Sequence, residues 1–114
     1  TDPEIGTVGM TEAEAEAAGF EVIAETAPLR GNGRALTLDD REGFVRIVGD
    51  SEDGFVLGTQ IVAPEASELL AELGLAVEMG ARLEDVAATI HSHPTLSEAV
   101  AEAAKGALGR AIHY

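Results

Sequence analysis

The residues of this chain best suited to chemistry lie close together, in the stretch from His91 to Glu98. Proline disfavours the α region for the residue before it, so Pro94 predicts that His93 is extended just ahead of a helix. Thr95, followed three residues later by Glu98, has the spacing of a capping box, which predicts a helix start with Glu98 in its first turn. The imidazole of His93 can then fold back toward this carboxylate. A histidine oriented by a glutamate is a pair suited to proton transfer.

The same residue types allow two other interpretations. In the first, Glu98 only accepts a hydrogen bond from the backbone N–H of Thr95, and His91 and His93 are ordinary surface histidines ahead of a helix. In the second, His91 and His93 project to the same side of an extended segment and share a metal ion with Glu98. Two histidines without a firm third ligand are a weak metal signal, so the spacing alone leaves all three interpretations open.

Four helices are predicted in the chain. The apolar residues behind the capping box recur on one helical face, and Pro64 suits the first turn of another helix that ends before Gly80. A third, short helix directly precedes the histidines, and a second capping box, Thr11 with Glu14, begins a fourth near the N-terminal end. The predicted helices cover Glu12 to Ala18, Pro64 to Met79, Leu83 to Ala88 and Leu96 to Leu108.

Extended segments fill the remainder of the chain. The clearest pair is joined by the polar turn 49–54, which predicts a hairpin, and its two strands are apolar on both faces. Such strands need helices on one side and a helix or a partner chain on the other. The predicted strands cover Glu4 to Val8, Phe20 to Ala27 with Pro28 ending it, Phe44 to Val48, and Phe55 to Val62, with a turn at 31–33 and a polar loop at 39–43.

Because hairpins and not βαβ crossovers link the strands, the fold class predicted is α+β. We expect an antiparallel sheet of three to five strands with helices packed on it. A chain of 114 residues suffices for one hydrophobic core, so residues 1–114 are expected to form a single domain.

Composition narrows the possible functions. The chain has 21 acidic and 7 basic residues and a formal net charge of −14, which disfavours nucleic acid as a partner. No apolar run is long enough to cross a bilayer and no signal peptide is evident, so we expect a cytoplasmic protein without membrane contact. The absence of cysteine excludes a redox dithiol within these residues. The acidic excess, with Lys105 as the one lysine, is typical of a protein from a salt-loving organism, and an ordinary acidic bias is the alternative.

The residues around the histidines resemble a known family. The run from His93 to Ala99 is similar to the C-terminal active-site signature of the pyridine nucleotide-disulfide oxidoreductases, which are flavin-dependent disulfide reductases. The longer run from Ile90 to Glu98 is most similar to the dihydrolipoamide dehydrogenases among them. The resemblance covers essentially the whole chain. Weaker similarity to the dimerisation domain of that family continues, in the same order, through residues 1–5, 8–12, 32–35, 43–47 and 107–113.

The resemblance implies a dimerisation domain that acts inside a larger enzyme. The FAD and NAD of the full-length enzyme belong to N-terminal domains that are absent from this chain, so no cofactor is expected in the chain alone. In a homodimer, His93 oriented by Glu98 would serve as acid/base for dihydrolipoamide at the flavin and disulfide of the partner subunit. His93 and Pro94 would contact the cofactor there, whereas His91 has no assigned role. The full-length enzyme would serve a lipoyl-bearing acyltransferase complex.

A function of another class stays open. A free-standing acidic binding module could have kept the fold and could use His91, His93 and Glu98 for a metal ion or a protein partner. The two hypotheses differ in whether a flavin-binding polypeptide is needed for function.

Overall fold

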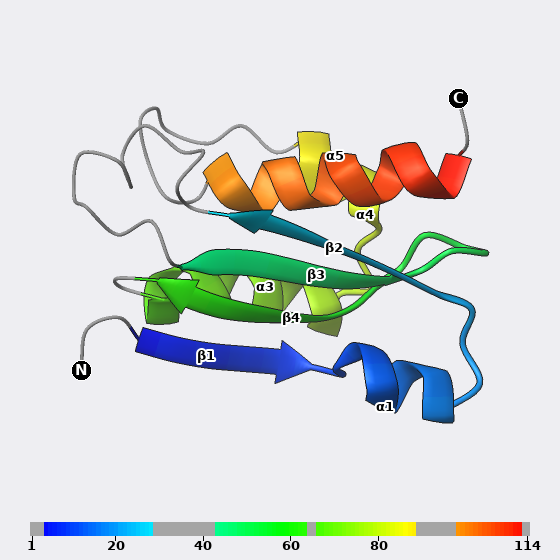
Figure 1. The fold of residues 1–114 in the computed structure, drawn as a ribbon, viewed down its shortest axis with the longest axis horizontal. Helices are drawn as coiled ribbons and strands as arrows, with labels where there is room; N and C mark the ends of the chain where they lie inside the picture. Colours follow the sequence, from blue (N-terminus) through cyan, green and yellow to red (C-terminus); the bar gives the residue numbers. More distant parts are fainter. Residues whose placement is uncertain (1–3, 29–42, 64–65, 89–97, 113–114) are drawn as a thin grey trace.

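The computed structural model describes residues 4–28, 43–63, 66–88 and 98–112. Within these ranges the chain forms a four-stranded antiparallel sheet with helices packed on it, so the predicted α+β class is confirmed (Figure 1). The elements are β1 (Glu4–Gly9), α1 (Glu12–Ala17), β2 (Val22–Pro28), β3 (Phe44–Asp50), β4 (Val56–Ala63), α3 (Ala66–Glu78), α4 (Leu83–Ala88) and α5 (Glu98–Ile112).

The strand order is β1-β4-β3-β2, so the first two strands of the chain form the two edges of the sheet (Figure 1). The predicted hairpin is present as β3 and β4, which pair antiparallel. β1 pairs with β4 and β2 pairs with β3, and α1 lies on the path between the two edges. This order was not predicted, because hairpin signals report only which neighbours in sequence can pair.

Most element boundaries differ from the prediction by one or two residues, and two of the differences have a clear physical reason. β2 continues through Pro28, which is in register with Phe44. Proline is tolerated there because β2 is an edge strand, where a missing N–H costs no hydrogen bond to a further strand. The described part of the last helix runs from Glu98 to Ile112, beyond the predicted end at Leu108, because alanine and isoleucine after Gly109 continue the helix.

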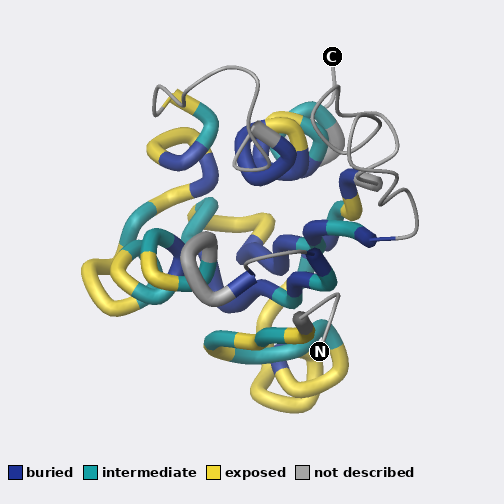
Figure 2. Tube along the Cα trace, turned by 90° about the vertical axis from the view of Figure 1, so that its left-hand side faces the viewer, coloured by how far each residue is buried: buried dark blue, intermediate teal, exposed yellow. Residues whose placement is uncertain are grey.

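The main core lies between one face of the sheet and the helices α3, α4 and α5. α3 packs on β1 and β4, α5 packs on β2 and β3, and α4 packs on α5. The buried stretches of the trace gather where the sheet and the helices meet (Figure 2). The largest side chains that are fully buried in this core are Val45, Ile47, Ile61, Leu73, Leu83 and Val100.

The opposite face of the sheet is covered in part by α1. A capping box fixes the start of this helix, since Thr11 Oγ1 accepts from the backbone of Glu14 and the Glu14 carboxylate accepts from the backbone of Thr11. The two strands of the hairpin are therefore buried on both faces only near their turn, and the prediction that both faces are covered holds for that end alone. Farther from the turn, Phe44, Arg46, Gln60 and Val62 are half-buried. The smaller core beneath α1 consists of Ala15, Ala24, Val48 and Leu57, with Met10 and Val22 packed against it.

A register shift between Val48 and Gly49 accounts for the change of face in β4. Beyond this shift Gly49 lies opposite Val56, which belongs to the main core, while Leu57 belongs to the core under α1. The alternation of faces along β4 is thus reversed at this irregularity, since Val56 before it and Ile61 after it both belong to the main core. In the described part of the chain, no helix has the length and hydropathy needed to cross a membrane.

The net charge of −14 leads to a prediction about salt. The folded domain holds these charges close together, and at molar ionic strength the Debye length falls to about 3 Å, which screens their repulsion. We expect the midpoint of thermal unfolding to be higher in molar potassium chloride than in dilute buffer. Circular dichroism melts at matched protein concentration test this, and a midpoint that is unchanged or lower in high salt contradicts the prediction.

Candidate functional site

The predicted acid/base stretch joins two helices. His91, His93, Pro94 and Thr95 lie outside the described residues, as does the side chain of Glu98. The backbone of Glu98 is described, and it begins α5, in agreement with its predicted place in the first turn of a helix. The interaction of the imidazole with this carboxylate stays a prediction.

The helix that carries Glu98 is held firmly on the sheet. Its inner face consists of small side chains, and Gly106 lies against β2, where an added Cβ would be 2.6 Å from Cγ of Glu25. Small residues allow the helix axis to approach the strands closely, so the position of its first turn is set by the core. The residues of α5 buried against the sheet and α4 are Ala99, Val100, Ala101, Ala103, Ala104 and Ala107.

The helix on the other side of the stretch is anchored as well. α4 ends at Ala88, and its Leu83 and Val86 are buried in the main core. α4 and α5 also pack on each other, so both ends of the segment 89–97 start from rigid elements. Figure 1 shows the first turn of α5 above the end of β2. A carboxylate in that turn is favoured by the positive end of the helix dipole.

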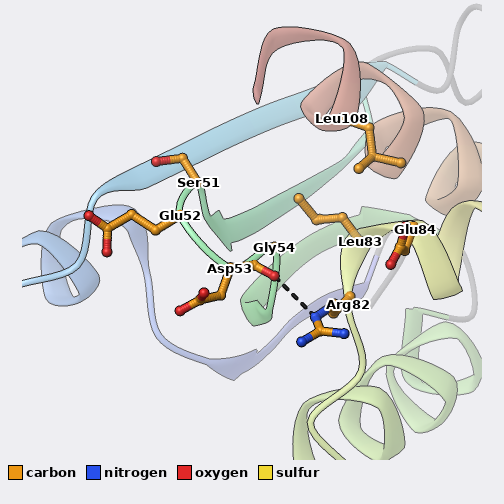
Figure 3. A pocket seen from close by; sticks show the side chains of 8 residues that line it. All are labelled: Ser51, Glu52, Asp53, Gly54, Arg82, Leu83, Glu84 and Leu108. Atoms are coloured by element: carbon orange, nitrogen blue, oxygen red, sulfur yellow. Dashed lines mark hydrogen bonds between the residues drawn. The ribbon is translucent and has the colours of Figure 1, made fainter. Parts of the chain in front are cut away.

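A surface pocket of about 200 Å³ lies where the β3–β4 turn meets the start of α4 (Figure 3). Arg82 spans it: Nε donates to the carbonyl oxygen of Asp53 at 3.1 Å, and the guanidinium lies 4.8 Å from the centre of the Phe55 ring. The backbone N–H of Arg82 donates to Asp85 Oδ2 at 2.8 Å. The lining residues are Ser51, Glu52, Asp53, Gly54, Arg82, Leu83, Glu84 and Leu108.

These contacts give Arg82 a structural role. It ties the hairpin turn to the start of α4, and the backbone adds hydrogen bonds from Leu83 to Gly54 (2.7 Å) and from Val56 to Ala81 (3.0 Å). No short sequence motif predicts these contacts, because Arg82 and Asp53 are 29 residues apart. The described residues contain no group of three or more histidine, cysteine or acidic side chains arranged to hold a metal ion.

A second surface feature lies on the outer side of α3. Leu75 of α3 and Met79, which directly follows the helix, are four residues apart and lie on the same side, and they are 63% and 75% exposed. A shallow pocket of about 240 Å³ adjoins them. We call this surface the α3 patch. Its pocket is lined by Glu72, Leu75, Ala76, Met79, Ala81, Asp85 and Val86.

Comparisons with known proteins agree with the resemblance seen in the sequence. The family model described as "Pyridine nucleotide-disulphide oxidoreductase, dimerisation domain" matches residues 1–104. The chain is 69% identical over 113 residues to dihydrolipoyl dehydrogenase 2 of Haloarcula marismortui and to dihydrolipoyl dehydrogenase of Haloferax volcanii. The match covers 99% of this chain and 24% of each relative, so the chain spans about a quarter of their length. Both sources are halophilic archaea, in agreement with the acidic composition.

Solved structures place the fold in the same family. LpdA from Mycobacterium tuberculosis is similar with a TM-score of 0.87 at 36% identity, over 93% of this chain and 23% of that one. The disulfide reductase RclA from Escherichia coli has a TM-score of 0.85 over 90% of this chain and 24% of its own, but at 23% identity it supports the fold alone. The family model, the haloarchaeal relatives and the shared fold together show that the chain belongs to the pyridine nucleotide-disulphide oxidoreductase family, as its dimerisation domain.

Proposed function

We propose that this chain is the dimerisation part of an FAD- and NAD-dependent dihydrolipoyl dehydrogenase and supplies an acid/base residue to the active site of the partner subunit. The observation that carries the proposal is the 69% identity to two dihydrolipoyl dehydrogenases over 99% of the chain. The packing of α4 and α5 supports it, because both ends of the segment with His93 start from fixed positions. The alternative of a free-standing binding module is not favoured, because the relatives that match 99% of this chain are dihydrolipoyl dehydrogenases.

In this proposal, His93 transfers protons and Glu98 orients it. A dithiol becomes a good nucleophile only as a thiolate, so His93 would accept a proton from the substrate thiol and later return it. Glu98 would hold the imidazole in the required orientation and stabilise its protonated form. The flavin, disulfide and nicotinamide of the full-length enzyme would carry the electrons. His93 and Pro94 are the residues of this chain proposed to contact that cofactor site.

A chimera tests the function. This chain replaces the matching 113 residues of the Haloferax volcanii dihydrolipoyl dehydrogenase, and the product is called the chimera below. We expect the chimera to bind flavin and oxidise dihydrolipoamide with NAD, and the 114-residue chain alone to be inactive. Steady-state NADH formation is the measurement. A chimera that is folded, dimeric and loaded with flavin but inactive contradicts the proposed function.

The dimer contact is proposed to include the α3 patch. Exposed leucine and methionine beside an apolar pocket are suited to an isologous contact, in which the same surface of two copies meets about a twofold axis. Binding of a lipoyl-bearing acyltransferase complex would be a property of the assembled enzyme, and a cytoplasmic location is proposed with it.

Substitution of the α3 patch tests the contact. The double change Leu75→Glu and Met79→Glu is expected to shift the 114-residue chain from dimer toward monomer in sedimentation equilibrium. Each subunit would bring two glutamates into the contact, and burying these carboxylates away from water is unfavourable. The control is Ala13→Glu, which adds the same type of charge at an exposed position of α1. A dimer that persists in the double variant would place the contact elsewhere.

A further inference from the structure

Arg82 occupies the position directly before α4, where the hydrogen bonds of that helix begin. Its carbonyl oxygen accepts from the backbone N–H of Asp85 at 2.9 Å and of Val86 at 3.2 Å. Serine, threonine, aspartate and asparagine are preferred at this position, because their side-chain oxygens accept from free N–H groups of the first turn. An arginine side chain only donates, so it cannot cap α4 in this way. The residue type therefore indicates a role other than starting the helix.

The side chain of Arg82 reaches the β3–β4 turn instead (Figure 3). Its Nε donates to the carbonyl oxygen of Asp53, and its guanidinium lies over the ring of Phe55. A hydrogen bond from a charged donor and a cation–π contact are both favourable. The backbone of Arg82 also forms an isolated β-bridge with Phe55. Backbone and side chain thus fix the start of α4 to the same turn.

The turn that receives this side chain is itself tied to the sheet. The N–H of Gly54 donates to the carbonyl oxygen of Asp50 at 2.6 Å, and the N–H of Glu52 donates to Asp50 Oδ1 at 2.9 Å. The N–H of Ser51 donates to the carbonyl oxygen of Glu21, just before β2, at 2.8 Å. The guanidinium is therefore bound to a part of the chain whose position is set by the strands.

α4 depends on such contacts because it is short. Its six residues make fewer than two turns, and a helix of this length is not stable by itself. Its buried side chains, Leu83 and Val86, are three residues apart and hold the inner face of the helix. The contacts of Arg82 act at the end of the helix, so they restrict its tilt about that face.

Anion binding is a less suitable role for this arginine. The carboxylates of Glu52, Asp53 and Glu84 line the same pocket and would repel a negative ligand. The guanidinium already has partners within the chain, at Asp53 and Phe55. A link between the turn and α4 is the role that these contacts support.

We propose that Arg82 is a positioning residue for the proton transfer assigned to His93, and this rests on the proposed function. α4 ends at Ala88, five residues before His93, so the tilt of α4 sets where the segment with the imidazole begins. Six helical residues are about 9 Å long, so a tilt of about 6° at the start moves the far end by about 1 Å. A misplacement of about 1 Å can lower a catalytic rate by about 10²-fold.

Arg82→Ser in the chimera tests this role. Serine removes the link to the turn but supplies an N-cap acceptor, so the start of α4 stays stabilised. We expect kcat for dihydrolipoamide to fall about tenfold, less than a full 1 Å misplacement would cost. KM, flavin content, dimer mass and the midpoint of thermal unfolding should not change, because the imidazole acts in the chemical step. Steady-state NADH formation and circular dichroism melts are the measurements.

Two further variants separate the link from the charge. Lys105→Ala removes a positive charge from an exposed position of α5, which changes the net charge by the same amount, and it should keep the parent turnover. Arg82→Lys keeps the charge and a donor that can reach the turn, and it should recover most of the kcat that Arg82→Ser loses.

Three results would overturn the positioning role. Parent turnover in Arg82→Ser would show that the link sets nothing at the active site. A lowered midpoint or a loss of flavin in that variant would assign Arg82 to stability. An equal loss of turnover in Lys105→Ala would assign the effect to net charge.

A readout in the 114-residue chain keeps this role separate from the proposed function. The ring signals of the histidines are followed by NMR, and their loss in His93→Gln identifies those of His93. Arg82→Ser should shift the His93 signals, whereas Lys105→Ala should leave them in place. Unchanged His93 signals in Arg82→Ser would contradict the positioning role, while an inactive but flavin-loaded parent chimera would contradict the proposed function alone.

Discussion

Replacing His93 by glutamine in the chimera is expected to lower the steady-state turnover of dihydrolipoamide by about 10²- to 10⁴-fold, the usual contribution of general acid–base catalysis. Glutamine keeps a hydrogen-bonding side chain of similar reach but cannot exchange a proton near neutral pH. Flavin content and dimer mass are measured for each variant, so that a loss of turnover is separated from a loss of cofactor or of the dimer.

Two further variants identify which residue is the base. Glu98→Gln should lower turnover less than His93→Gln, because the carboxylate orients the imidazole without moving the proton, and part of its effect will be lost helix capping. His91→Gln should turn over normally. If His91→Gln loses turnover while His93→Gln turns over normally, the base is His91 and the assignment to His93 is wrong. Normal turnover in all three variants would exclude an acid/base role for these residues. Glu98 would then only cap the helix, and the histidines would be ordinary surface residues.

Gly58→Ala is expected to produce the largest loss of stability. Gly58 is buried in β4, and an added Cβ would lie 2.0 Å from the carbonyl oxygen of Met10 and 2.5 Å from its nitrogen. Both atoms belong to the backbone that connects β1 with α1, so the clash is relieved only by moving that connection off the sheet. Overpacking of this kind costs about 1–3 kcal/mol of unfolding free energy, and backbone obstacles lie at the upper end.

The matched control is Gly109→Ala. Gly109 lies in α5 with no atom within 4 Å of an added Cβ, so alanine meets no obstacle and gains helix propensity of about 1 kcal/mol. Urea unfolding of the two variants and the parent chain, at one protein concentration, measures both effects. Equal stability of Gly58→Ala and the parent would mean that the β1–α1 connection yields without cost.

The candidate site was predicted from local sequence, and the structure showed how the helices on either side of it, α4 and α5, are packed. Proline and the capping-box spacing placed the helix start at Thr95 to Glu98, and α5 begins at Glu98 in the described residues. The family resemblance, which supplied the roles of His93 and Glu98, depends on adjacent residues and needs no tertiary information. How the imidazole meets the carboxylate lies outside the described residues and stays a prediction.

The sequence by itself determined the elements of this protein. Apolar periodicity, glycine, proline and the two capping boxes identified each described strand and helix, and α4 was predicted with its observed bounds. The α+β class followed, since hairpin strands with helices have few other arrangements. These signals are local: each depends on side chains within one or two turns of helix or a short strand.

Only the tertiary structure decided which elements meet. The order β1-β4-β3-β2 and the contacts of Arg82 with the hairpin turn depend on residues tens of positions apart. An exposed Ile5 and a buried Ile61 have the same side chain, and their strands have similar patterns. Burial is a property of what packs against a residue, so it becomes known only when the strands are placed beside their partners.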